Sequence, residues 1–257
     1  MLIHSVLKAL DIIDCLSVEK EPLSAREVAR RCNLSRPTAY RLLISLANKN
    51  FVVSPRESHF TLSPKFLSIS KNLLDRYDLI EIAKPYMDQL SQFSGETVHL
   101  TILDGVEMLY IGKVDSSQSI RMHSSTGTRN PVYSTATGKA VLASLPLSEL
   151  QQVIRQIQFT SRTAKTITTR EELIEALEII RHQKYAIDDL ENEEGIRCVA
   201  APVFDHSGTV IGGLSISGPA YRLEMDRLVE LSKHVITAAD TISHLSGYIP
   251  NKREEKK

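Results

Sequence analysis

Residues 32–43 read CNLSRPTAYRLL, and this stretch decides how the first part of the chain folds. Ser35 suits a helix N-cap, and Pro37 suits the first turn, where its missing N–H removes no helical hydrogen bond. Ala39, Leu42 and Leu46 recur on one side of the predicted helix as a packing face. The other side carries Arg36, Pro37, Tyr40, Arg41, Ile44 and Asn48. A helix that served only for packing would not need this outward face.

A second helix is predicted directly before the first, in LSAREVARRC at residues 23–32. Ser24 can cap it, and Glu27, three residues later, completes a capping box. The short connection Asn33-Leu34 then leads into the helix that Ser35 begins. Two helices joined by so short a turn, the second presenting cationic and polar groups from its first turns, form a helix-turn-helix that fits the DNA major groove.

The segment after this motif predicts a β-hairpin wing. Strands are expected at Phe51–Ser54 and His59–Leu62, with Arg56 in the turn between them, placed to touch the DNA backbone or minor groove. Arginine can pair with phosphate or guanine, and hydroxyls near a helix start can bind phosphate. The predicted DNA-binding residues are Ser24, Arg26, Ser35, Arg36, Thr38, Tyr40, Arg41 and Arg56.

Upstream of the motif, Val6, Leu10 and Ile13 recur at helical spacing, and Leu7, Ile12 and Leu16 widen the same apolar face. They predict an amphipathic helix that ends near Ser17, with Ser5 as its N-cap. Downstream, residues 64–77 predict a linker helix. We therefore expect a winged helix-turn-helix domain at 1–63, the linker, an effector domain at 78–250 and a disordered charged tail at 251–257.

Composition and charge agree with a DNA-binding protein made of two domains. The 257 residues carry no net charge, but residues 1–77 hold 12 Lys and Arg against 7 Asp and Glu, whereas residues 78–250 hold 15 against 22. A basic N-terminal segment followed by an acidic segment is expected when the N-terminal segment binds a polyanion. Three scattered cysteines, no long apolar run and no signal peptide predict a cytoplasmic protein without disulfides or membrane spans.

From residue 96 the pattern changes to strands separated by turns. TVHLTILDGVEMLYIGKVDS predicts a hairpin around Asp104-Gly105, IRMHSS a short strand and RNPVY a loop. Helices are expected in STATGKAVLASL, LSELQQVIRQI, TREELIEALEIIRHQ and RLEMDRLVELSKHVITAADTISHLSG. The helical stretch at residues 66–95, before this region, is expected to be broken near Asp78 and again at Pro85. A second hairpin is expected around His206-Ser207-Gly208. The fold class is α+β, with a central antiparallel sheet flanked by helices.

The motifs LSAREVARRCNLSRPTAYRLLISLANKNFV, STATGKAVLA, EEGIRCVAAPVFD and IGGLSISGP together resemble the IclR family of bacterial transcription regulators. The resemblance extends from about Ser5 to Gly247. Within the family, RMHSSTGTRNPVYSTATGK and ITTREELIEAL are most similar to regulators of sugar-acid and ketodeoxygluconate catabolism. The resemblance implies a GAF- or profilin-like effector domain, a repressor of a carbon-utilisation operon, and a homodimer or homotetramer on an approximately palindromic operator.

The resemblance also implies which residues contact the effector. Its motifs place the contacts at Ala136, Thr137, Asp188, Cys198, Ser215 and Ser217. Ser215 and Ser217 share a strand face, so their hydroxyls can enter one cavity. Hydroxyls, a helix N-terminus and a carboxylate suit a small organic acid or sugar acid. Ala136-Thr137 departs from the glyoxylate-responding members, which have smaller residues there, and this leaves the ligand open. The other acidic residues of AIDDLENEEGIRC are expected in a solvated loop.

Two alternatives belong to other function classes. The chain could be a small-molecule enzyme, or a module that regulates another protein, with the N-terminal helices serving for dimerisation. An enzyme would need a nucleophile and base at a supporting spacing, and Cys198 in an apolar run has no such partner. No metal-ligand spacing or phosphate-binding loop is present either. We therefore predict no enzyme activity, no cofactor and no metal.

Overall fold

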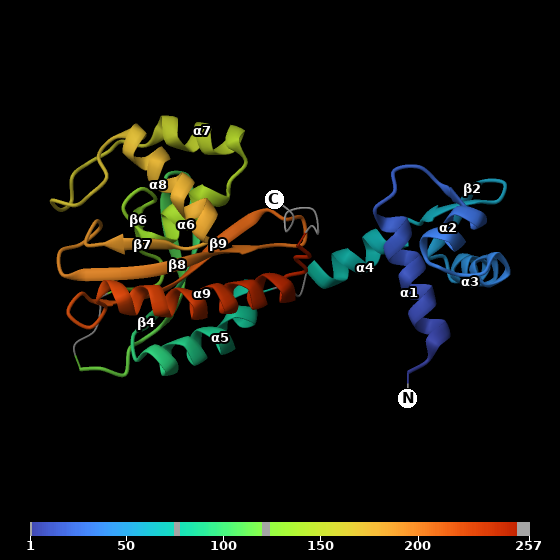
Figure 1. The fold of residues 1–257 in the computed structure, drawn as a ribbon, viewed down its shortest axis with the longest axis horizontal. Helices are drawn as coiled ribbons and strands as arrows, with labels where there is room; N and C mark the ends of the chain where they lie inside the picture. The colour runs from blue at the N-terminus through green and yellow to red at the C-terminus, as the bar shows by residue number, and fades with distance from the viewer. Residues whose placement is uncertain (1, 75–77, 120–123, 251–257) are drawn as a thin grey trace. The chain divides into compact units, whose positions relative to one another are not determined.

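A computed structural model describes residues 2–74, 78–119 and 124–250 (Figure 1). The chain divides into two compact units, residues 1–77 and residues 78–257. The predicted tail at 251–257 and most of the predicted strand IRMHSS lie outside the described residues. Within the described part, no helix is both long and apolar enough to cross a membrane.

The N-terminal unit contains four helices and a three-stranded antiparallel sheet. In chain order its elements are α1 (His4–Ser17), β1 (Leu23–Ser24), α2 (Ala25–Arg31), α3 (Arg36–Asn48), β2 (Val52–Arg56), β3 (His59–Leu62) and α4 (Lys65–Leu74). The strand order is β1-β3-β2, so the predicted hairpin has a third strand, β1, that local patterns did not indicate. A small core between these elements includes Ile12, Val28, Ala39, Leu43 and Phe60.

The packing face of α1 is shorter than predicted. Ile12 and Leu16, one turn apart, are buried, whereas Val6 and Leu10 are exposed. The core of this unit is small, and only the second half of α1 reaches it (Figure 1). The predicted cap is also wrong, because the N-cap position is Ile3 and Ser5 lies inside the helix.

The C-terminal unit begins with α5 (Leu79–Ser94), which continues through Pro85. The prediction that Pro85 breaks this helix was wrong. Pro85 lies on the exposed side of the helix, where the carbonyl left without its N–H partner can bind water. Ala83, Met87 and Leu90 on the buried side hold the helix against the sheet across that position.

A six-stranded antiparallel sheet forms the centre of this unit, with the order β6-β5-β4-β9-β8-β7. The strands are β4 (Thr97–Asp104), β5 (Glu107–Val114), β6 (Arg129–Pro131), β7 (Ala186–Asp189), β8 (Ile196–Phe204) and β9 (Val210–Pro219). Both predicted hairpins are present, β4 with β5 and β8 with β9. The sheet and its helices confirm the predicted α+β fold class.

Helices cover both faces of the sheet (Figure 1). On one face, α5 and α9 (Met225–Leu245) pack against strand residues such as Val98, Leu100 and Ile216. On the other face lie α6 (Ala136–Ser144), α7 (Leu147–Gln156) and α8 (Arg170–Gln183), which pack against a separate cluster that includes Met108 and Ala200. Because side chains alternate along a strand, residues between those facing α9 are directed towards α6.

Two segments predicted as loops contain strands. RNP at 129–131 forms β6 and pairs with β5, and AIDD at 186–189 forms β7 and pairs with β8. Each is a short edge strand of the sheet, where pairing with one long neighbour supplies the hydrogen bonds and no long apolar run is needed. The second difference matters most, because it places Asp188, a predicted effector contact, in β7 and buries it.

Candidate effector cavity and DNA-binding helix

A cavity of about 280 Å³ lies in the C-terminal unit between the N-terminus of α6 and the sheet. All six residues predicted to contact the effector line it: Ala136, Thr137, Asp188, Cys198, Ser215 and Ser217. These residues come from α6 and from three neighbouring strands, over 82 positions of the sequence. The fold therefore gathers the predicted set around one space.

Strand register explains why the strand residues meet. Asp188 on β7 is the direct cross-strand partner of Cys198 on β8, and Cys198 is the partner of Ser217 on β9. Ser215 lies two residues before Ser217 and therefore on the same face. The intervening Ile216 is buried on the opposite face, in the cluster with α9. A row of a carboxyl, a thiol and a hydroxyl thus crosses three strands at the cavity.

The start of α6 supplies the opposite wall. Thr135 caps the helix, its Oγ1 accepting from the Gly138 N–H at 3.2 Å. The N–H groups of Ala136 and Thr137 lie in the first turn and so have no acceptor within the helix. The buried Thr137 Oγ1 has no hydrogen-bond partner within the described residues. Gly213 of β9 lets the start of α6 pack close to the sheet, because a Cβ at this position would lie 3.0 Å from the Thr137 Cβ.

Asp188 has the most perturbed carboxyl at the cavity. Its side chain is 2% exposed, and burial raises its pKa to about 7. The charge of Glu191 raises the pKa further, whereas Lys139 and the backbone N–H groups of Glu191 and Asn192 oppose the increase. Asp188 therefore exchanges a proton near neutral pH, and it can accept or donate a hydrogen bond to a ligand.

The remaining acidic residues of this segment lie in different surroundings. Glu193 and Glu194 are exposed, as predicted for a solvated loop. Glu191 was predicted to be solvated and is instead buried, forming an ion pair with the buried Lys139 of α6. Burial raises the pKa of Glu191, and the Lys139 charge and hydrogen bond oppose this. The buried pair keeps two charges next to the cavity.

Several cavity residues were not predicted from the sequence. They are Tyr110, Ser124, Thr128, Arg129, Asn130, Thr135, Asn192, Glu193 and Ile196. Most come from β5, from β6 and from the turn before β6, and two of them, Arg129 and Asn130, lie in RNPVY, which was predicted as a loop. Their presence depends on the pairing of β6 with β5, which joins Met108 to Asn130 and Leu109 to Arg129. No local sequence signal indicates that pairing.

The cysteine and histidine near the cavity do not form a catalytic pair. Cys198 lies beside Asp188 and Ser217, and burial raises the pKa of its thiol well above the usual range. Burial lowers the pKa of His99 to about 3, and its Nε2 lies 2.7 Å from Ser124 Oγ. Within the described ranges, no group of three or more His, Cys, Asp or Glu residues could hold a metal ion.

In the N-terminal unit, the sequence signals at the start of α3 are present as predicted. Ser35 is the N-cap, its Oγ accepting from the Thr38 N–H at 3.4 Å and lying 2.8 Å from Thr38 Oγ1. Pro37 lies in the first turn. Asn33 provides the turn from α2 with a φ of 52°, a backbone conformation that asparagine tolerates well. These contacts fix the direction in which α3 leaves the turn.

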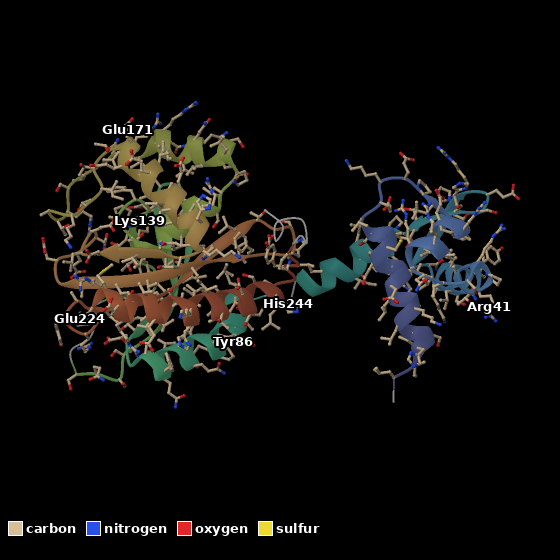
Figure 2. The ribbon with its side chains drawn as sticks, viewed as in Figure 1. Arg41, Tyr86, Lys139, Glu171, Glu224 and His244 are labelled. Carbon is tan, nitrogen blue, oxygen red and sulfur yellow. The ribbon has the colours of Figure 1, made fainter. Side chains whose placement is uncertain are left out.

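The predicted outward face of α3 is exposed. Arg36 and Arg41 are both exposed, and Tyr40 is 48% exposed with its ring edge-to-face against Phe60 of β3 at 6.3 Å between centroids. Figure 2 shows Arg41 at the outside of α3. Arg56 is exposed at the end of β2, beside the hairpin turn. Within the described residues, none of Arg36, Arg41 and Arg56 forms an ion pair, so each guanidinium group is available to bind DNA.

Ser24 and Arg26, the other two predicted DNA contacts, lie in different surroundings. Arg26 is exposed on α2. Ser24 caps α2, and its hydroxyl accepts from the Glu27 N–H while donating to Glu27 Oε2 at 2.7 Å. This capping box occupies the Ser24 hydroxyl inside the protein, which leaves it less able to bind phosphate than the sequence implies.

Comparisons with known proteins match both units of the chain. Residues 5–55 match the IclR helix-turn-helix domain, and residues 71–244 match the bacterial transcriptional regulator IclR C-terminal domain. The chain is 40% identical over 247 residues to the transcriptional regulator KdgR of Escherichia coli K12, covering 96% of this chain and 94% of that protein. It is 34% identical to the regulator XynR of the same strain, covering 96% and 98%.

Solved structures give the same result. The chain is 36% identical to the IclR protein of Thermotoga maritima with a TM-score of 0.65, covering 95% of this chain and 99% of that chain. The C-terminal domain of E. coli KdgR is 43% identical over 67% of this chain and all of that domain, with a TM-score of 0.61. These relatives are transcription regulators rather than enzymes. This chain belongs to the IclR family of DNA-binding transcription regulators, whose C-terminal domain binds an effector.

Proposed function

We propose that this regulator represses a carbon-utilisation operon, acts in the cytoplasm, and responds to a small organic acid or sugar acid bound in the cavity. The similarity to KdgR supports a sugar-acid or ketodeoxygluconate regulon. The observation that carries the proposal is the polar lining of the cavity. It combines the first turn of α6, the hydroxyls of Thr137, Ser215 and Ser217, and the carboxyl of Asp188.

Each part of this lining suits one part of such a ligand. The free N–H groups at the start of α6 favour a carboxylate, because a helix N-terminus carries partial positive charge. The row of Asp188 and Ser217 offers partners for hydroxyl or keto oxygens. A cavity of about 280 Å³ favours a ligand smaller than a drug-sized molecule, such as a sugar acid. A neutral sugar would leave the α6 N-terminus without its anion.

On DNA, we propose that α3 enters the major groove with Arg36 and Arg41, while Arg56 contacts the backbone or minor groove from the wing. A homodimer would place two such helices on two half-sites of an approximate palindrome, and two dimers would form a tetramer. A tenfold change in operator affinity requires about 1.4 kcal/mol of differential effector binding between the two states of the protein.

Two measurements test this function. In a thermal-shift panel, gluconate, galacturonate, ketodeoxygluconate and pyruvate are compared with neutral glucose, and a ligand that binds the folded state raises the melting temperature. Fluorescence anisotropy with the protein's own upstream DNA then measures operator binding with and without that ligand. We expect at least one acid to bind and to weaken operator binding. Binding of glucose alone, or equal binding to scrambled DNA at physiological salt, contradicts the proposal.

Arginine variants separate DNA recognition from ligand sensing. Arg36→Ala and Arg41→Ala should abolish specific operator binding and leave the thermal shift with the ligand unchanged. Arg155→Ala is the matched control, because Arg155 is also exposed but lies on α7 in the other unit. If both α3 variants bind the operator normally, α3 is not the recognition helix.

A further inference from the structure

The Lys139–Glu191 pair lies behind the cavity and has no role in the site described so far. Lys139 lies on α6 (Figure 2) and is 3% exposed, and Glu191 follows β7 and is 9% exposed. The Lys139 Nζ donates to Glu191 Oε1. In the described part of the chain, neither side chain lines the cavity. Two charges kept from water in this way are costly unless their position serves a purpose.

The pair is connected to the cavity through Asp188. The Glu191 backbone N–H donates to Asp188 Oδ1 at 2.7 Å, and the Asn192 N–H donates to the same oxygen at 3.3 Å. Leu190, between these residues, has a φ of 67°, so the chain turns sharply enough to bring both N–H groups back to Asp188. The location of Glu191 therefore decides where the Asp188 carboxyl points.

Other contacts hold the backbone of this turn, including one from Arg162, whose Nε donates to the Asn192 carbonyl at 2.9 Å. Thr163 Oγ1 donates to the Leu190 carbonyl at 2.6 Å, and Thr166 Oγ1 donates to the Glu191 carbonyl at 2.7 Å. The Glu191 side chain is instead held by α6, the helix whose first turn forms the opposite wall of the cavity. The ion pair thus ties the two walls together.

We infer that Lys139 and Glu191 are positioning residues for effector recognition, which fix the orientation of the Asp188 carboxyl and set its charge. The inference rests on the proposed function, because it assumes that the effector contacts Asp188. It adds that recognition depends on two residues outside the cavity. It also predicts that their charges control the pH at which the cavity changes from a hydrogen-bond donor to an acceptor.

The charged and titratable groups that line or adjoin the cavity around Asp188 come from every element that surrounds it. They are Lys139 of α6, Glu191 and Glu193 after β7, Cys198 of β8, Tyr110 of β5 and Arg129 of β6. Burial raises the pKa of Asp188, the negative charge of Glu191 raises it further, and Lys139 lowers it. Removing the Glu191 charge while Lys139 remains should therefore lower the pKa of Asp188.

The first experiment uses Glu191→Gln without any ligand. Glutamine keeps a side-chain oxygen that can accept from Lys139 but carries no charge. Carboxyl ¹³C NMR of the full chain follows the ionisation of Asp188, with the resonance assigned by its absence in Asp188→Asn. We expect a wild-type midpoint near pH 7 and a midpoint at lower pH in Glu191→Gln. An unchanged midpoint in the folded variant overturns the inference that Glu191 sets this charge.

The second experiment measures effector affinity by calorimetry in variants of the lysine. Lys139→Met is compared with Lys165→Met, which removes an equal charge from an exposed ion pair with Asp189 in the same segment. We expect Lys139→Met to bind about tenfold more weakly, the effect of misplacing one charged hydrogen bond, and Lys165→Met to bind as wild type. Equal affinities in the two variants overturn the positioning role.

A double variant covers the case in which Lys139→Met does not fold. Lys139→Met with Glu191→Gln removes both buried charges and should restore folding, because no unpaired charge remains buried. If the pair were only structural, effector affinity would return with the fold, and that result overturns the inference. If the pair positions Asp188, the folded double variant still binds about tenfold more weakly.

The ligand-free titration separates the two hypotheses. Should no acid bind the wild-type protein, the proposed function fails, yet the NMR midpoints still show whether Glu191 controls Asp188. Should an acid bind while Glu191→Gln leaves the midpoint unchanged, the proposed function stands and the inference fails.

Discussion

Replacing Asp188 with Asn should stabilise the ligand-free protein above neutral pH, although it removes a residue of the effector cavity. Burial moves the pKa of this carboxyl from 3.8 to about 7, so ionising it in the folded state is unfavourable. At about 1.4 kcal/mol per pH unit, the folded protein loses roughly 4 kcal/mol of stability to this one charge. Asn keeps an oxygen for the two backbone donors and never ionises.

The sign of the pH dependence follows from proton binding. Between pH 3.8 and about 7 the folded state holds a proton on Asp188 and the unfolded state does not, so unfolding free energy falls as pH rises. The contribution of Asp188 is complete below pH 3.8 and is lost above pH 7. From pH 5 to pH 8 the unfolding free energy of the wild type should therefore fall by about 3 kcal/mol relative to that of Asp188→Asn.

Urea unfolding of both proteins at pH 5 and pH 8 measures this difference, because titrations elsewhere in the chain cancel between them. Asp189→Asn is the matched control. Burial opposes ionisation of Asp189, but hydrogen bonds from Lys165 and Arg197 outweigh it and lower the pKa. The difference in unfolding free energy between wild type and Asp189→Asn should therefore be the same at pH 5 and pH 8. A difference between wild type and Asp188→Asn that is equal at pH 5 and pH 8 would refute the reasoning.

Three further variants test the other parts of the molecule. Ser35→Ala removes the cap of α3, and it should cost about 1 kcal/mol in denaturant unfolding of the N-terminal unit and weaken operator binding. Thr137→Val removes a buried hydroxyl without a partner, so calorimetry should show effector affinity about tenfold lower and differential scanning calorimetry no loss of ligand-free stability. Arg41→Gln should reduce the slope of log affinity against log salt by about one if Arg41 contacts a phosphate. An unchanged slope would place Arg41 away from the DNA backbone.

The sequence predicted best those features that neighbouring residues determine. The capping box of Ser24 and Glu27, the cap at Ser35 and the hairpin at Asp104-Gly105 each involve groups within a few positions, and all are present. The alternation that places Ser215 and Ser217 on one face is equally local. The grouping of the six cavity residues came from the family resemblance, since they span α6 and three strands.

The features that were missed depend on distant partners. RNP reads as a loop until β5 pairs with it, and AIDD reads as a solvated acidic segment until β8 buries it. Lys139 and Glu191 are 52 residues apart, and no spacing in the sequence indicates that they form an ion pair. The face of α1 was misjudged because helical periodicity does not say how far a small core extends.

Polar groups without partners at the cavity support its proposed role as a sensor. At the cavity, the Thr137 hydroxyl is buried without a hydrogen-bond partner in the described residues, and ionised Asp188 is poorly solvated. Each is a cost that a hydroxylated acid can reduce by supplying a partner, whereas an apolar molecule of the same size cannot. On the proposed function, these unmet hydrogen-bonding groups would favour such an acid and would increase the free energy that its binding releases. Only about 1.4 kcal/mol of that free energy has to differ between the operator-bound and free proteins to change operator affinity tenfold.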